Sequence, residues 1–287
     1  MPRTTASINS FVSGEFSAKL DGRTDFEKYS SGCKTLQNML VHPQGAAARR
    51  VGTQFIAEVK TSAAKTRLIP FEFSTTQTYV LEFGNNYIRF FKDKGQIFSS
   101  GSAYEISTPY LTAELFEIKF AQSADVMYLT HPNHEVMKLS RTGHTSWTLA
   151  EVAFTDGPYL SINTTSTTLT PSSASTGSRN ITASAITGIN GGVGWLATDV
   201  GRIISFNSGK AKITARTSAT VAVATVTTAF TNTDAKDDWK LGAFSDTTGH
   251  PSCVSFFEQR LVFAGTTDEP QTLYFSKSGD YENMTTG

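Results

Sequence analysis

Apolar and polar residues alternate along much of this chain in short runs that turn-forming residues separate. Alternation with a period of two predicts half-buried β-strands. Three sets of three runs follow this pattern, at residues 68–73, 79–84 and 87–91, at 116–120, 125–130 and 136–139, and at 253–256, 260–265 and 273–276. Small antiparallel sheets that recur every ~40–50 residues are typical of propeller blades. The pattern therefore predicts a repeated β scaffold.

The composition changes between the second and third sets. Residues 161–187 are mostly Ser, Thr and Ala, which predicts either a linker or weakly hydrophobic, exposed strands. Ordered strands are predicted again over residues 195–244, with Asn207-Ser208-Gly209 as a hairpin turn. The residue composition of this region differs from that of the segments on both sides, which indicates a small β domain inserted between blades.

The predicted fold class is all-β, with partial β-propeller blades and an inserted small β domain. Residues 1–159 would form an N-terminal segment and the first blades, 160–249 the inserted Ser/Thr-rich domain, and 250–287 a further blade. Closed propellers have roughly four to eight blades. We therefore expect the missing blades from other subunits or, preferably, from the continuation of a longer chain.

Two predicted elements precede the first blade. Phe26, Tyr29, Cys33, Leu36 and Leu40 recur at intervals of three and four, which predicts a short helix, although Gly32 weakens it. Apolar residues within residues 54–59 predict a strand.

Charge narrows the classes of function. The chain has 25 Lys and Arg and 25 Asp and Glu residues, so its formal net charge is zero. This argues against a dedicated binder of nucleic acid or anionic membranes, which has a basic stripe. It is compatible with a conduit for DNA, because a neutral wall avoids the phosphate contacts that hold DNA in place.

The cysteine pattern and the hydropathy suggest a cytosolic site of synthesis. Cys33 and Cys253 form neither a C-x-x-C pair nor a zinc spacing, so we expect two reduced thiols. The N-terminus lacks the apolar core of a signal peptide, and no segment approaches the ~20 apolar residues of a membrane span.

Several groups of residues could carry chemistry, and each has a simpler interpretation. His131 and His134 flank Pro132-Asn133 and could bind a metal, but without a nearby Cys we favour a surface turn. His144 and Asp156 could join a serine in a triad, but no G-x-S-x-G motif supports hydrolysis. We predict no catalytic residue, no metal site and no cofactor.

Paired carboxylates are the best enzymatic alternative. Some propellers cleave glycans with two carboxylates, and this chain offers Glu114, Glu117, Asp125 and Glu135. The sequence does not give the separation that this chemistry needs, so we favour solvated strand edges and turns for these residues.

One further set of residues has a recognisable order. It begins at residues 10–17, FVSGEFS after Ser10, and continues through LDGRTD at 20–25, Lys28-Tyr29 and Gly32-Cys33. A basic pair, Arg49-Arg50, a small residue and a strand follow, and then the hairpin at residues 71–97. Residues 256–265 and 276–281 complete the pattern.

In this order the chain resembles the tail nozzle proteins (tail tubular protein B) of short-tailed bacteriophages. The resemblance covers most of residues 8–155 and 250–284, whereas residues 160–249 match less well and the family's chains are longer. It implies a structural virion protein in the phage tail, assembled in the host cytoplasm. Its subunits would form a homohexameric ring below the portal and adaptor rings, with adaptor and tail fibre proteins as partners and DNA passing through without specific binding.

Within this hypothesis, Arg49 and Arg50 are a possible subunit interface, because a sustained grip on DNA would oppose ejection. A solvated turn is the simpler interpretation of this pair. The alternative function is that of a glycan-binding or glycan-cleaving propeller domain for host attachment. Ring assembly would favour the nozzle, and saturable sugar binding by a monomer would favour the alternative.

Overall fold

Strands dominate the computed structural model, which describes residues 7–74 and 76–285. Strands hold 44% of the chain, and the described ranges contain short 3-10 helices but no α-helix, which confirms the predicted all-β class. Within these ranges no helix has the length and apolar character needed to cross a membrane. The chain divides into two units, one ending at Phe55 and the other beginning at Ile56.

The N-terminal unit contains little regular structure. Its elements are the strands β1 (Gly14–Glu15), β2 (Gly32–Cys33), β3 (Met39–Val41) and β4 (Ala47–Arg49) and the 3-10 helices η1 (Ala18–Leu20) and η2 (Glu27–Ser31). Strand β1 pairs with β2 in parallel, and β3 pairs with β4 antiparallel. Among residues 7–55 no hydrophobic side chain is buried.

The predicted helix over residues 26–40 is wrong. Only the five residues of η2 are helical, because the backbone at Gly32 is extended and pairs with Gly14. A Cβ at position 32 would overlap the ring of Phe16, which stacks on Tyr29. Phe26 and Tyr29, the first two residues of the predicted pattern, thus pack against Phe16. The strand predicted at residues 54–59 is also wrong, since these residues have no strand partner.

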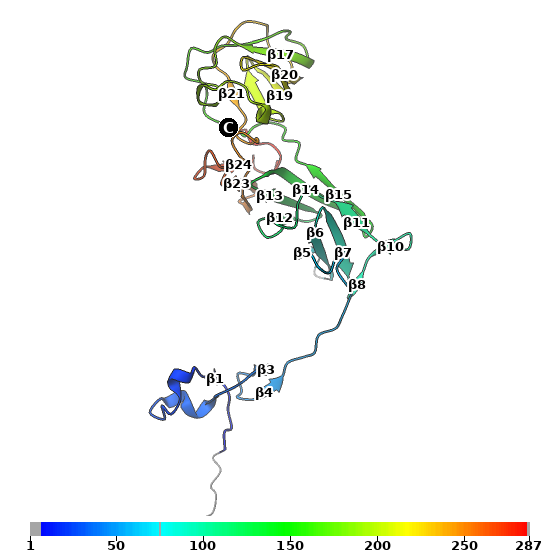
Figure 1. The fold of residues 1–287 in the computed structure, drawn as a ribbon, viewed down its shortest axis with the longest axis vertical. Helices are drawn as coiled ribbons and strands as arrows, with labels where there is room; N and C mark the ends of the chain where they lie inside the picture. Colours follow the sequence, from blue (N-terminus) through cyan, green and yellow to red (C-terminus); the bar gives the residue numbers. More distant parts are fainter. Residues whose placement is uncertain (1–6, 75, 286–287) are drawn as a thin grey trace, which may run out of the picture. The chain divides into compact units, whose positions relative to one another are not determined.

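The second unit begins with a five-stranded antiparallel sheet. Its strands are β5 (Arg67–Ser74), β6 (Gln77–Gly84), β7 (Tyr87–Lys92), β8 (Gly95–Gln96) and β11 (Glu105–Ser107), and a small hairpin joins β9 (Phe98–Ser99) to β10 (Ser102–Ala103). The strand order is β11-β7-β6-β5, with β8 beside β7 (Figure 1). Ile69 and Phe71 are buried while their neighbours in β5 are exposed, as the alternation predicts.

Two further antiparallel sheets match the second and third predicted sets. One sheet has the consecutive strands β12 (Lys119–Ser123), β13 (Val126–His131), β14 (His134–Gly143) and β15 (Ser146–Glu151) (Figure 1). The other has the consecutive strands β22 (Cys253–Phe257), β23 (Arg260–Ala264) and β24 (Leu273–Phe275). Strand β12 begins three residues later than predicted, because residues 112–117 form turns.

The sheet of β12 to β15, here the middle sheet, has a hydrophobic core on each of its two faces. Met127 and Leu129 belong to the cluster that contains the inner face of the first sheet. Tyr128, on the opposite face of β13, belongs to the cluster that contains Leu261 and Phe263 of the last sheet. Sheets covered on both faces by neighbouring sheets are consistent with propeller-like blades.

A six-stranded sheet lies between the second and third blade-like sheets in the sequence. It comprises β16 (Leu169–Pro171), β17 (Gly177–Ala183), β18 (Ile203–Phe206), β19 (Gly209–Arg216), β20 (Val221–Thr228) and β21 (Lys240–Leu241), in the order β16-β17-β20-β19-β18-β21, with the 3-10 helices η3 (Asn190–Gly192) and η4 (Ala197–Asp199). The predicted hairpin turn is confirmed, because Asn207 and Ser208 both have positive φ between β18 and β19.

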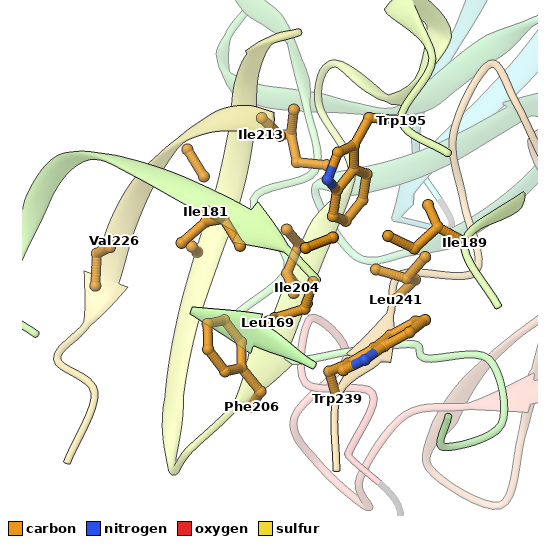
Figure 2. Close-up of a cluster of buried hydrophobic side chains, with 14 of the residues drawn as sticks. Leu169, Ile181, Ile189, Trp195, Ile204, Phe206, Ile213, Val226, Trp239 and Leu241 are labelled. Atoms are coloured by element: carbon orange, nitrogen blue, oxygen red, sulfur yellow. The ribbon is translucent and has the colours of Figure 1, made fainter. Parts of the chain in front are cut away.

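This sheet has a hydrophobic cluster of its own. Figure 2 shows its side chains gathered around Ile204, with the indoles of Trp195 and Trp239 among them. The indole N–H of Trp239 donates to the Thr167 carbonyl at 2.8 Å, which fixes this ring. The Ser/Thr-rich stretch thus contains two strands, β16 and β17, rather than only a linker. The domain boundaries at 159/160 and 249/250 stay a prediction.

Candidate functional site

The predicted interface residues Arg49 and Arg50 are both exposed in the N-terminal unit. Arg50 donates from Nε to the Asn38 side chain at 2.9 Å, and Arg49 makes no ion pair among the described residues. Apolar side chains are exposed close to them in the sequence: Leu40 is 55% and Val51 is 81% exposed. Guanidinium groups beside exposed apolar side chains are typical of protein interfaces. The interface role stays a prediction.

A second candidate site surrounds the turn between β13 and β14. His131 ends β13, His134 begins β14, and the two residues are opposite each other in the register. Glu114 comes from the turn segment 112–117 that precedes β12. One nitrogen of each histidine and one oxygen of Glu114 all lie within 4.8 Å of one another. The sequence alone did not pair Glu114 with these histidines.

The interpretation of residues 131–134 as a surface turn is correct for the backbone but wrong for His131. Its side chain is fully buried, with the ring of Tyr110 6.1 Å away, and Tyr110 is also fully buried. Burial lowers the pKa of His131, and the neighbouring His134 lowers it further, although Glu114 and Glu117 oppose both effects. His131 is therefore a neutral imidazole near pH 7 and able to act as a ligand.

Glu114 is held in place by two hydrogen bonds. Its Oε2 accepts from the Leu111 amide at 2.8 Å and lies 2.9 Å from Nε2 of His134. Burial acts to raise the pKa of Glu114, but the Leu111 amide and His134 outweigh it and lower that pKa. The group is thus an ionised carboxylate beside two imidazoles. Glu117 is close as well, with Oε2 3.4 Å from Nε2 of His131.

The other predicted carboxylates lie elsewhere. Asp125 pairs with Arg141 at 2.9 Å. Glu135 lies in a pocket of about 280 Å³ beside Val136, Val152 and Tyr159. Burial, a hydrogen bond to Glu151 and the charge of Glu151 together raise the pKa of Glu135 to about 7, although Lys212 opposes the shift.

Glu135 therefore interacts directly with Glu151, a partner that the sequence did not indicate. Retaining glycosidases separate their carboxyl groups by roughly 5–5.5 Å, and inverting enzymes separate them by more. The role of Glu114, Glu117, Asp125 and Glu135 as paired catalytic carboxylates stays a prediction.

The imagined triad is not assembled among the described residues. His144 contacts the hydroxyl of Tyr79 through Nδ1 at 2.6 Å. Asp156 accepts from the hydroxyl of Tyr159 at 2.7 Å and pairs with Lys210 at 2.5 Å. Both groups thus have structural partners. Cys33 and Cys253 are both free thiols.

No protein-family model matches the chain, and no curated protein matches it significantly.

Proposed function

We propose that this chain is a structural subunit of a phage tail nozzle, which assembles as a homohexameric ring and forms a conduit for DNA ejection. It performs no catalytic step. The ring sits in the virion tail, contacts adaptor and tail fibre proteins, and is assembled in the host cytoplasm. The proposal starts from the resemblance of residues 8–155 and 250–284 to that family.

The observation that carries the proposal is the exposure of the apolar side chains in the N-terminal unit. Residues 7–55 bury no hydrophobic side chain, and Val51 and Phe55 are even 81% and 76% exposed. A segment that buries so little apolar surface cannot offset the conformational entropy lost on ordering. It needs a covering surface, and in a ring the neighbouring copy supplies one.

The blade-like sheets support a scaffold role. The middle sheet is covered on both faces, and aromatic side chains fill its contacts, with Trp147 at 4.5 Å from Phe90 and at 4.8 Å from Phe71 between ring centroids. Such stacked sheets suit a rigid wall. Balanced charge also suits a wall past which DNA moves, because the chain has no excess of cations to hold phosphates.

The test is the native mass of the purified chain together with negative-stain imaging of the same sample. A ring of six copies with an open axial hole is expected. Because the ring can require the adaptor for assembly, the measurement is repeated with the adaptor protein present. A strict monomer under both conditions that binds sugars saturably on a glycan array would overturn the proposal in favour of the glycan-binding alternative.

A matched pair of variants locates the interface. Arg49→Glu reverses a charge in the exposed N-terminal unit, and we expect it to shift the sample from rings toward monomers. Lys94→Glu reverses a charge that is also exposed, in the turn after β7, and is the control. If both variants, or neither, dissociate the ring, Arg49 has no specific role in the interface.

A further inference from the structure

The His131–His134 turn brings together donor atoms that are far apart in the sequence. Glu114 Oε2 and His134 Nε2 are 2.9 Å apart, and a nitrogen of His131 lies within 4.8 Å of both residues' donor atoms. The three side chains are buried or mostly buried: His131 is inaccessible, Glu114 is 17% exposed and His134 is 22% exposed. Two imidazoles and a carboxylate that converge in this way form a typical transition-metal ligand set.

A second observation points to a missing ligand. Nε2 of His131 is buried and has no hydrogen-bond partner among the described residues, and the nearest carboxylate oxygen, Glu117 Oε2, lies 3.4 Å away. The hydroxyl of Tyr110, whose ring lies 5.2 Å from His134, is buried without a partner as well. Buried polar atoms without partners are rare in folded proteins and call for an explanation.

We infer that Glu114, His131 and His134 bind one divalent transition-metal ion, with Glu117 close enough to serve as the fourth ligand. Zinc fits this set best, because structural zinc sites are four-coordinate and accept nitrogen and carboxylate oxygen. Calcium and magnesium prefer sites built from oxygen alone. Two carboxylates would balance the two charges of the ion, which makes the site neutral.

Binding has a definite consequence for the proton on His131. Its Nδ1 accepts a hydrogen bond from the Asn133 amide at 3.1 Å, so the neutral ring carries its proton on Nε2. A metal on Nε2 displaces this proton, and the ring then carries one on Nδ1. The Asn133 amide must turn away from Nδ1. We therefore expect metal binding to change the tautomer of His131 and to shift the backbone of Pro132-Asn133.

The bound ion would act as a structural clamp. Glu114 and Glu117 belong to the turn segment 112–117, which leads from the first sheet to the second, and the histidines belong to the β13–β14 hairpin. A metal would tie this connection to the hairpin beside it. The inference does not depend on the proposed function, because a clamp of this kind stabilises the chain in any assembly.

The test uses the full chain, stripped with EDTA, dialysed and titrated with ZnCl₂ by calorimetry. We expect one equivalent to bind, and Co²⁺ to give the visible absorption of a tetrahedral site. Loss of an outer-shell partner costs roughly 10–100-fold in metal affinity, and loss of a ligand costs more. Glu114→Gln and His134→Gln should therefore each weaken zinc binding by at least about 100-fold.

His42→Gln is the matched control, because His42 is exposed in the N-terminal unit and belongs to no such cluster. It should leave the affinity unchanged. A spectroscopic readout separates ligation from a structural effect: ¹⁵N NMR of the histidine rings should show His131 protonated on Nε2 without metal and on Nδ1 with zinc. Binding below one equivalent, equal affinity in all three variants, or an unchanged His131 tautomer would each overturn the inference.

Discussion

At the scale of single residues, the contact between Glu135 and Glu151 makes the stability of this protein depend on pH. Burial, together with the hydrogen bond and the charge of Glu151, raises the pKa of Glu135 to about 7. Lys212 on β19 opposes the shift, and Asp246 adds to it. In the unfolded chain the same carboxyl group titrates near pH 4.3. Between these pH values the folded state holds one proton more than the unfolded state.

The sign of the effect follows from this difference. Stability falls with rising pH wherever the folded state binds more protons. The contribution of Glu135 is complete below about pH 4.3 and is lost as the pH rises through about 7. Urea midpoints measured from pH 5 to pH 8 should therefore fall more steeply for the native chain than for Glu135→Gln, whose amide imitates the protonated group. Parallel pH profiles for the two proteins would contradict the prediction.

The residues of the candidate sites were only partly predictable. The sequence offered Glu135 as a paired carboxylate but gave no reason to pair it with Glu151, because that contact depends on the register that places Glu151 opposite Met137, two residues from Glu135. It offered His131 and His134 as a weak metal motif without Glu114. The burial of His131 depends on Tyr110 and on the turn segment 112–117, which lie far from it in the sequence.

At the scale of elements, the strands were predicted where one face of a sheet is buried. Ile69 and Phe71, or Leu261 and Phe263, alternate with more exposed residues, and the period of two follows directly from this geometry. The helix over residues 26–40 was mispredicted because Phe26 and Tyr29 pack against Phe16 and the chain at Gly32 is extended. No pattern within residues 26–40 predicts that the ring of Phe16 covers Gly32.

The element that joins the first two sheets is β15, through Trp147. Its indole is 5% exposed and lies 5.2 Å from the ring of Tyr79, in the cluster that both sheets share. Trp147→Ala leaves a cavity that stacked sheets cannot close, so it should lower the free energy of unfolding by about 3–5 kcal/mol. Phe98→Ala, at a side chain that is 58% exposed, should change it by less than about 0.5 kcal/mol.

Urea denaturation gives the free energy of unfolding of both variants on the same scale. It is followed by the circular dichroism of the backbone, because one variant lacks a tryptophan. The comparison is informative because Phe98 lies in the same unit, on the small β9–β10 hairpin. A loss for Trp147→Ala no larger than that for Phe98→Ala would mean that the two sheets do not depend on a shared core.

At the scale of the whole molecule, the two units differ in how they are stabilised. The unit from Ile56 onward contains three clusters of buried hydrophobic residues, whereas residues 7–55 contain no buried hydrophobic side chain. The sequence did not predict the division between residues 55 and 56, because apolar residues are present in both units and only their burial differs. Burial, unlike composition, depends on which surfaces meet.

A chain that begins at Ile56 should therefore fold as the full chain does. The hydrophobic burial that drives folding lies within the second unit, so the urea midpoint and the circular dichroism of its strands should be unchanged. Under the proposed function, the same chain should no longer form rings, because the exposed apolar residues and the Arg49-Arg50 pair have been removed. Native mass and denaturation measured on one sample separate the two expectations. A folded chain that still forms rings would place the interface in the second unit, and a chain that fails to fold would show that the first 55 residues contribute to its core.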